Sequence, residues 1–240
     1  MGATPTALLV ALALPGDLAA SFVDDLAAGF RDALDELAPE CAVEGGDLTV
    51  SDTLTVAVTA LGVLDRVTAV RRSGAGVGDD VAIAGELGAA ARGLRLLFTR
   101  FRDDAGTPIP VDASTLSEAE RRDLDAQVHP RPPIALGAEA ARAGATALMD
   151  VSDGLLLDAA RLADASGVTI SLIADLDHDA LTGGEDHSLL ACFPAVTTPA
   201  GFDVIGRVEE RGEVPVLVRG QMPTTRGGWD PYADWDSALG

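Results

Sequence analysis

The stretch Asp150-Val151-Ser152-Asp153-Gly154 separates an apolar run at residues 145–149 from a segment with apolar side chains at helical spacing. A short apolar run of this kind predicts a buried strand. The segment after Gly154 carries leucine and alanine at a spacing typical of one helix face, which predicts an amphipathic helix. The stretch is therefore the loop of a strand–loop–helix unit. Strands and helices also alternate elsewhere without a strict period, so we expect an α/β (α+β) fold.

Two carboxylates flank a hydroxyl group in this loop. Asp150 and Asp153 are three residues apart and can converge on one cation, and Ser152 can bond a phosphate oxygen near the helix N-terminus. Side chains of the same types also cap helices, because their oxygens accept hydrogen bonds from free backbone N–H groups. The residues alone favour neither interpretation.

Periodicity predicts the remaining elements. A domain boundary is expected near residues 64–67, and Ser117-Glu118-Ala119-Glu120 has the form of a capping box that opens a helix. Strands are expected at 6–14, 42–44, 53–64, 80–84, 168–173, 189–193, 204–208 and 216–218, and helices after Gly16-Asp17 and at 89–101 and 136–143.

Gly45-Gly46-Asp47 is a second candidate site, because it follows the short strand expected at 42–44. Two glycines allow close backbone approach, and Asp47 would then lie at an exposed turn, which suits a metal ion. The alternative is an ordinary turn, since Gly-Gly-Asp is common turn chemistry.

Two further segments carry polar or aromatic groups in loops. Gly183-Gly184-Glu185-Asp186 places two acids before a strand, and the alternative interpretation is a solvated turn. Near the end of the chain, Trp229 follows two glycines. Its ring could stack on a flat heterocycle or could pin down the terminus, and the residues alone favour pinning.

Composition excludes several classes of function. The 240 residues include 38 acidic and 17 basic ones, with a formal net charge of −21, and every basic residue is an arginine. Without lysine, P-loop and Schiff-base chemistry are excluded. Because the chain would repel a polyanion, no nucleic-acid partner is expected. A nucleotide remains compatible where a divalent metal bridges its phosphates to carboxylates.

Neither a membrane segment nor a disulfide framework is expected. Residues 8–14 are apolar but too short to span a bilayer, and no basic residue precedes them as in a signal peptide. Cys41 and Cys192 are far apart in the sequence and form no CxxC pair. This pattern predicts reduced, buried cysteines in a cytoplasmic protein without a membrane partner.

Taken in order, the motifs resemble those of the thiamine-monophosphate kinase family, within the aminoimidazole ribonucleotide synthetase-like superfamily. The resemblance implies a two-domain fold of that type, with a truncated N-terminal ATP-binding domain at 1–65 and a C-terminal domain at 66–240. The segments that carry it are Met1-Gly2-Ala3-Thr4-Pro5, Gly45-Gly46-Asp47, Arg71-Arg72-Ser73-Gly74-Ala75, Ile83-Ala84-Gly85-Glu86-Leu87-Gly88, Met149-Asp150-Val151-Ser152-Asp153-Gly154-Leu155, Gly183-Gly184-Glu185-Asp186 and Gly228-Trp229-Asp230.

The resemblance also implies an activity, which is ATP- and Mg²⁺-dependent phosphorylation of thiamine monophosphate to thiamine diphosphate by direct in-line transfer, in a homodimer. Carried over by position, the motifs imply a role for each matching residue. The implied magnesium ligands are Asp47, Asp150 and Asp153. The implied contacts with ATP are made by Gly46, Asp47, Arg72 and Ser152. Glu185 and Trp229 are implied to contact the substrate.

The sequence also departs from the family pattern. Family members carry Gly-Asp-Asp, Ser-Thr-Asp and Ser-Asp segments upstream of the position matched by Met1, and these supply many of the metal-binding aspartates. The chain has none of them, so we expect a first-domain sheet with missing strands and an exposed edge. His187 also replaces the usual tyrosine. Two alternatives follow, a catalytically inactive fragment that binds only nucleotide and a sister enzyme of the same superfamily.

Overall fold

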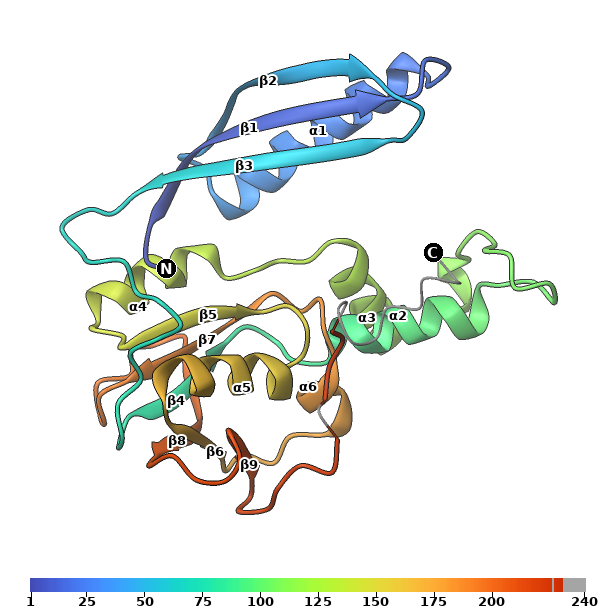
Figure 1. Cartoon of the computed structure of the whole chain (residues 1–240). Helices are drawn as coiled ribbons and strands as arrows, with labels where there is room; N and C mark the ends of the chain where they lie inside the picture. The colour runs from blue at the N-terminus through green and yellow to red at the C-terminus, as the bar shows by residue number, and fades with distance from the viewer. Residues whose placement is uncertain (226, 231–240) are drawn as a thin grey trace. The chain divides into compact units, whose positions relative to one another are not determined.

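The computed structural model describes residues 1–225 and 227–230 (Figure 1). These residues form two compact units, of which one is Gly2–Ala69 and the other comprises Met1 and the residues from Val70 onward. The expected boundary at 64–67 lies close to this division. The assignment of ATP binding to the first part of the chain stays a prediction.

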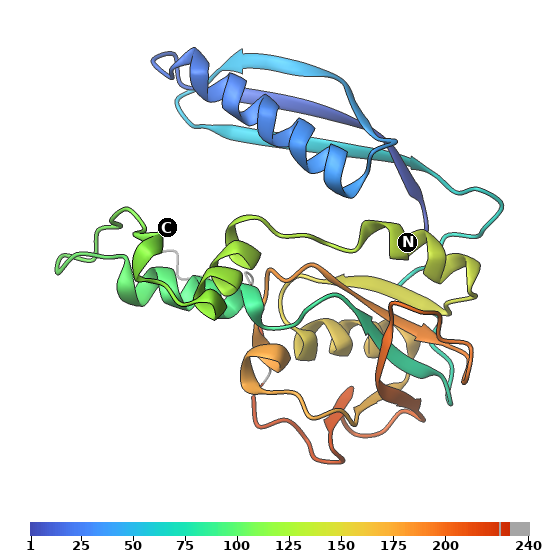
Figure 2. The same cartoon turned by 180° about the vertical axis from the view of Figure 1, so that it is seen from behind.

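The first unit is a sheet covered by one helix. Its strands are ordered β2-β1-β3, with β1 parallel to β2 and antiparallel to β3. Figure 2 shows the helix α1 running along one face of this sheet. The bounds are β1 Thr4–Leu14, α1 Ala20–Leu37, β2 Ala42–Val50 and β3 Thr55–Val63, which confirms the predicted order of strands and helix.

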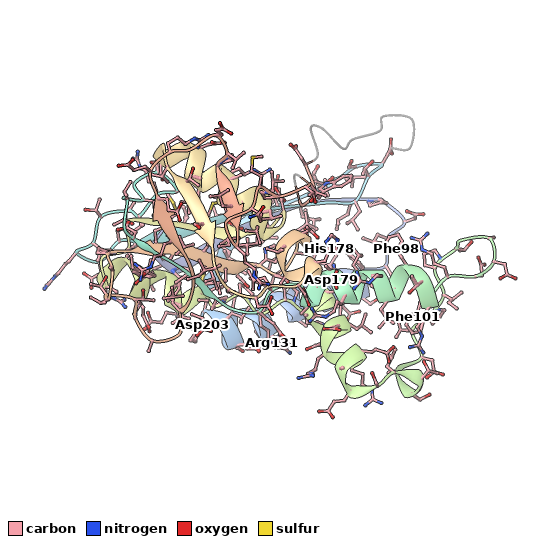
Figure 3. The ribbon with its side chains drawn as sticks, turned by 90° about the horizontal axis from the view of Figure 1, so that it is seen from below. Phe98, Phe101, Arg131, His178, Asp179 and Asp203 are labelled. Carbon is pink, nitrogen blue, oxygen red and sulfur yellow. The ribbon has the colours of Figure 1, made fainter. Side chains whose placement is uncertain are left out.

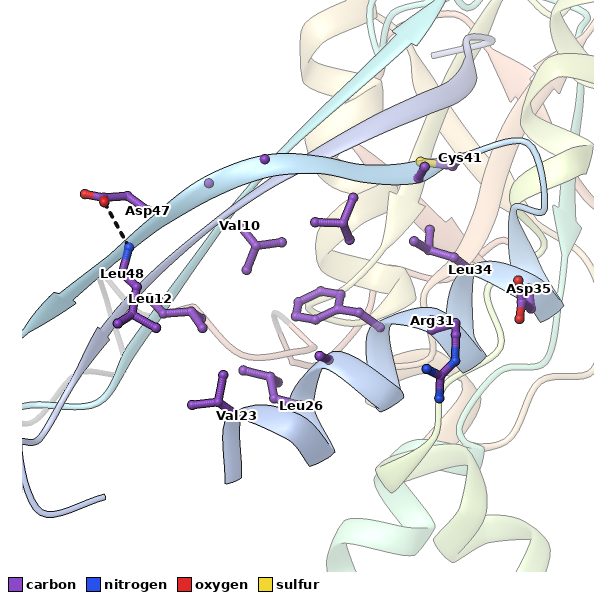
Figure 4. A pocket seen from close by; sticks show the side chains of 16 residues that line it. Val10, Leu12, Val23, Leu26, Arg31, Leu34, Asp35, Cys41, Asp47 and Leu48 are labelled. Atoms are coloured by element: carbon purple, nitrogen blue, oxygen red, sulfur yellow. Dashed lines mark hydrogen bonds between the residues drawn. The ribbon is translucent and has the colours of Figure 1, made fainter. Parts of the chain in front are cut away.

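This unit has a thin core. Its only buried residues are Gly2, Leu14, Ala38 and Cys41, while β2 and β3 are exposed along their whole lengths. An apolar groove of about 840 Å³ lies between α1 and the strands β1 and β2 (Figure 4). Its lining includes Val10, Leu12, Leu26, Phe30, Leu34 and Val43.

The predicted end of a strand at Gly45-Gly46-Asp47 is wrong, because β2 continues through these residues to Val50. A Cβ atom added to Gly46 would lie 1.8 Å from the carbonyl oxygen of Val10 on β1. Glycine therefore allows the two strands to pair closely here, and no turn is required. Asp47 is exposed within the strand, and its Oδ1 accepts a hydrogen bond from the N–H of Leu48 at 2.9 Å.

The second unit contains a sheet with strands ordered β5-β7-β4-β8-β6-β9. Its strands and helices match the predicted ones closely, except for the short helix at His178–Thr182, which was not predicted. The bounds are β4 Asp80–Ala84, α2 Ala89–Arg100, a 3-10 turn at Ala113–Thr115, α3 Glu118–Val128, α4 Ile134–Arg142, β5 Ala147–Val151, α5 Leu155–Ser166, β6 Thr169–Leu172, α6 His178–Thr182, β7 Ser188–Phe193, β8 Asp203–Glu209 and β9 Val216–Val218.

Helices pack on both faces of this sheet, because alternate side chains of a strand point to opposite faces. Val81 and Ile83 of β4 belong to a buried cluster with the apolar side of α5. Ala82 and Ala84 belong to a second cluster that includes Ala140 of α4. The sheet therefore fixes the start of α5 against the end of β5, and residues 152–154 form the loop between them. The predicted end of this strand at residue 149 is wrong, because Asp150 and Val151 pair with β7 as part of β5.

Helices α2 and α3 form a hairpin beside the sheet. A Cβ atom on Gly93 would lie 2.1 Å from the carbonyl oxygen of Asp123, so the two helices pack with almost no space between their backbones. The predicted capping box at Ser117 and Glu120 is confirmed. Figure 3 shows Phe98 on this hairpin, where the Arg102 guanidinium lies 4.0 Å from the centre of the ring.

The described residues also bear on the cysteine and membrane predictions. Cys41 and Cys192 are both free and buried, as expected, and burial raises the pKa of the Cys192 thiol to about 12. Within residues 1–225 and 227–230, no helix is long and apolar enough to cross a bilayer.

Candidate functional site

The Asp150–Gly154 stretch is held by an aspartate that the sequence analysis did not single out. Asp158, in the first turn of α5, is completely buried. Its Oδ2 accepts hydrogen bonds from the backbone N–H groups of Ser152 and Asp153, both at 3.0 Å. Asp158 therefore satisfies two N–H groups of the loop that precedes α5. The alternative that Ser152 or Asp153 caps α5 is wrong, because α5 has no side-chain cap at its N-terminus.

Arg161 lies one turn further along α5 and joins two carboxylates. Its Nη1 donates to Asp158 Oδ1 at 2.8 Å and forms a short contact with Asp153 Oδ2. Hydrogen bonds to Asp153 and Asp158 raise the pKa of Arg161. Burial raises the pKa of Asp158, although its hydrogen bonds and the nearby guanidinium act in the opposite direction. The loop thus contains an extended charged network.

Glu185 lies directly against this loop. Its backbone N–H donates to the carbonyl oxygen of Ser152 at 2.8 Å, and the N–H of His187 donates to Val151 at 3.0 Å. Both Glu185 and His187 have positive φ, 69° and 52°, a conformation that is uncommon outside glycine. Strained backbone of this kind persists where surrounding contacts hold it, which is common at functional sites.

Asp186, between these two residues, supplies two of those contacts through its side chain. Its Oδ2 accepts from the N–H of Gly88 at 2.7 Å and its Oδ1 from the N–H of Ala90 at 3.0 Å, at the start of α2. Burial raises the pKa of Asp186, and the two N–H groups oppose this effect. The loop before β7 is thus anchored to α2 and β5 at once, so it is not the freely solvated turn that the residues alone allowed.

Trp229 joins the same region through its backbone. Its N–H donates to the carbonyl oxygen of Asp153 at 2.9 Å, and a Cβ atom on Gly228 would lie 2.1 Å from that oxygen. The backbone at Trp229 is therefore pinned to the loop, whereas the residue as a whole is 55% exposed. It lines an open hollow of about 410 Å³ together with His178 and Thr182. The structure thus brings residues near 152, 185 and 229 together.

Asp150 lies in β5, just before this loop, whereas Arg72 lies elsewhere in this unit. Asp150 is exposed on β5, opposite Leu189, and its charge raises the pKa of the Met1 amino group, which burial lowers more strongly. The carbonyl oxygen of Arg72 accepts a hydrogen bond from Ser166 at the last position of α5. With 12 residues, α5 is about 18 Å long, so the backbone of Arg72 lies at the end opposite Ser152.

The donor set is compatible with magnesium only in part. Among the residues that the structure describes, no group of three or more His, Cys, Asp or Glu side chains could hold a metal ion. Magnesium, however, often takes one or two carboxylates and completes its shell with phosphate oxygens and waters. The carboxylate of Asp153 can supply one such ligand to a cation that also takes phosphate oxygens, and the described residues form no cage made by protein alone. Gly46 and Asp47 belong to the other unit.

Comparisons with known proteins identify the family. Residues 1–64 match the model described as AIR synthase related protein, N-terminal domain. The chain is 38% identical over 256 residues to the thiamine-monophosphate kinase of Mycobacterium tuberculosis, covering 99% of this chain and 71% of that protein. For the Corynebacterium glutamicum enzyme the identity is 34%, with coverage of 97% and 72%.

Solved structures agree with these sequence matches. The structure described as AaThiL complexed with AMPPCP and TMP superposes with a TM-score of 0.79 at 29% identity, covering 95% of this chain and 74% of that one. The Stenotrophomonas maltophilia thiamine-monophosphate kinase gives a TM-score of 0.76 at 31% identity, with coverage of 92% and 74%. The fold is therefore that of the predicted superfamily, and the chain belongs to the thiamine-monophosphate kinase family.

Proposed function

We propose that this protein transfers the terminal phosphoryl group of ATP directly to thiamine monophosphate, forming thiamine diphosphate. Family membership supports this reaction, as do the substrate and the ATP analogue named in the related AaThiL complex. The structural observation that carries the proposal is the pair of backbone hydrogen bonds that fasten Glu185 and Trp229 to Ser152 and Asp153. Residues expected to contact ATP and residues expected to contact the substrate are thereby joined at one loop.

The nucleotide and its magnesium ion are assigned to one side of the site. Asp150 and Asp153 are proposed magnesium ligands in the second unit, and Asp47 is a proposed magnesium ligand in the first unit. A bound magnesium ion would neutralise charge on the phosphates. Ser152 has a half-buried hydroxyl that can donate to a phosphate oxygen. Gly46, Asp47 and Arg72 are proposed ATP contacts. The Arg72 guanidinium suits phosphate oxygens because its fork of N–H groups can bind two of them.

Glu185 and Trp229 are the proposed substrate residues. The exposed indole beside the hollow offers a flat apolar face for the rings of thiamine, whose thiazolium is positively charged and therefore also gains a cation–π attraction. The backbone of Glu185 is held by the strained, anchored loop, and its exposed carboxylate is proposed to add a negative charge near that cation.

The reaction itself needs little more than positioning. The attacking group is an oxygen of a phosphate, which is already largely deprotonated at neutral pH, so no general base is required. We therefore assign no catalytic side chain. The contribution of this chain is to align the two phosphates in line and to offset their mutual repulsion.

One observation favours a second candidate, a protein that binds nucleotide without turnover. The described residues offer no cluster of three or more possible metal ligands, and a triphosphate with several cations needs more carboxylates than one loop provides. The two candidates differ in whether thiamine diphosphate appears. If the protein is instead a sister enzyme of the same superfamily, the phosphoryl group is transferred to an acceptor other than thiamine monophosphate.

We further assign a homodimer and a cytoplasmic location. Support for the homodimer is the exposed apolar surface of the first unit, where Val56 and Val58 share one face of β3 and are 41% and 47% exposed. Contiguous apolar surface of this kind marks interfaces more often than free surface. The free state of both cysteines supports a reducing compartment. Light scattering on the purified chain measures the oligomeric state directly.

The activity test compares initial rates of thiamine diphosphate formation for the wild type, Asp153→Asn and Asp164→Asn. Asp164 is a matched control, because it lies near the other end of α5 and pairs with Arg211 in an exposed ion pair. We expect product from the wild type and Asp164→Asn and a loss of at least about a hundredfold in Asp153→Asn. Nucleotide binding without product would favour the second candidate, and equal rates in all three proteins would refute the role of Asp153.

A further inference from the structure

Arg161 is bonded to the carboxylate of Asp153, which the proposed function assigns to a cation as a ligand. Its Nη1 contacts Asp153 Oδ2, while the other oxygen, Oδ1, accepts a hydrogen bond from Ser152 Oγ at 3.3 Å. Both oxygens of Asp153 are therefore engaged by protein groups. A cation that binds Asp153 has to share these oxygens or replace the groups that hold them.

The backbone of the loop does not depend on Arg161. Asp158 Oδ2 alone accepts both N–H groups, from Ser152 and Asp153, and the guanidinium reaches the other oxygen of Asp158. Arg161 is three residues further along α5, and helix side chains tilt toward the N-terminus, so the guanidinium lies back over the loop. What it adds is a positive charge beside Asp153.

This ion pair is accessible to solvent and can therefore exchange partners. The side chains of Arg161 and Asp153 are 31% and 27% exposed, whereas that of Asp158 is only 1% exposed. Asp158 keeps Arg161 near the loop even when Asp153 is released. The guanidinium then remains within reach of any anion that arrives with the cation.

We infer that Arg161 is a built-in competitor for the cation at Asp153, which keeps the bare divalent ion weakly bound and favours the ion when it arrives with nucleotide phosphates. The inference rests on the proposed function for the identity of the ligand. A bare cation displaces the guanidinium and leaves a positive charge without its partner. A cation carried by a triphosphate brings oxygens to which the released guanidinium can donate. Arg161 is thus a positioning residue that couples cation binding to nucleotide binding.

The test is a titration of the full chain with Mn²⁺ alone, followed by electron paramagnetic resonance of the free ion. Replacing the guanidinium by a neutral side chain, in Arg161→Gln or Arg161→Met, should tighten Mn²⁺ binding by about tenfold, the size expected for one partly exposed like charge. Arg161→Lys keeps the charge and should bind as the wild type does. Arg211→Gln is the matched control, since Arg211 pairs with Asp164 away from this loop.

A second titration, with a non-hydrolysable ATP analogue present, measures the coupling. The analogue should tighten Mn²⁺ binding more in the wild type than in Arg161→Gln. Unchanged or weaker Mn²⁺ binding in both neutral variants, or no binding in any of the proteins, would overturn the inference. Neither readout requires turnover, so absence of thiamine diphosphate would count against the proposed function and leave this inference standing.

Discussion

Replacing Asp158 by alanine should destabilise the second unit by about 3 kcal/mol, through loss of the contacts that hold the loop at residues 152–154. Asp158 is 0% exposed and accepts from the N–H groups of Ser152 and Asp153 at 3.0 Å each. Hydrogen bonds to a charged acceptor contribute about 1.5 kcal/mol or more apiece, and removing the acceptor leaves both donors unpaired. Arg161 contributes little to the loss because it is 31% exposed and can be hydrated.

The assay is urea unfolding at neutral pH, followed by far-UV circular dichroism on the whole chain. Asp158→Asn keeps one oxygen that can accept from both N–H groups, so its loss should be about half that of Asp158→Ala. Asp164→Asn serves as the control on the same helix, because Asp164 is 58% exposed and its loss should stay within about 0.5 kcal/mol. A value for Asp158→Ala as small as that of the control would refute the claim that Asp158 fixes the loop.

Three further outcomes are expected. Gly46→Ala should destabilise the first unit by about 2 kcal/mol or more, because the added Cβ atom would meet the backbone of β1. Gly29→Ala, on the open surface of α1, should stabilise the unit by about 0.5–1 kcal/mol. Hydrogen exchange measures both changes, and equal effects of the two substitutions would contradict this reasoning. Arg95→Gln should lower the free energy of unfolding at pH 7 by about 0.5–1 kcal/mol, because Arg95 lowers the pKa of Asp179 below 3.8. In denaturant unfolding, the difference between the two proteins should vanish as the pH falls through that lowered pKa. A difference that does not depend on pH would exclude this linkage. Trp229→Ala should raise KM for thiamine monophosphate about tenfold without changing KM for ATP, with Trp229→Phe intermediate, and equal rises for both substrates would contradict stacking on thiamine.

Local periodicity predicted most of the fold. The runs that became β1, β5 and β7 are apolar and short, and α5 repeats its apolar side chains at helical spacing. Gly45-Gly46-Asp47 was misread because glycine favours turns in general, whereas here the reason for Gly46 is a neighbouring strand that the local sequence does not reveal. The short helix α6 was missed, although Asp177 at its N-cap, which accepts from Ala180 N–H at 2.8 Å, is a readable signal.

The site was only partly predictable for a similar reason. The motifs pointed to Ser152, Glu185 and Trp229, but hydrogen bonds between segments far apart in sequence join them. Asp158 was missed because an acid in a helix is usually read as a solvated side chain. Its position among leucines, within Leu155-Leu156-Leu157-Asp158-Ala159, was the available signal, since an acid on an apolar face needs partners when buried.

The most direct measurement of the central claim follows the labelled γ-phosphate of ATP when the full chain is incubated with ATP, magnesium and thiamine monophosphate. The account predicts that label appears in thiamine diphosphate, only when thiamine monophosphate is present, and that Asp153→Asn abolishes this transfer while Asp164→Asn retains it. Label released as inorganic phosphate without thiamine diphosphate, or label left in ATP by a folded protein that binds the nucleotide, would contradict it.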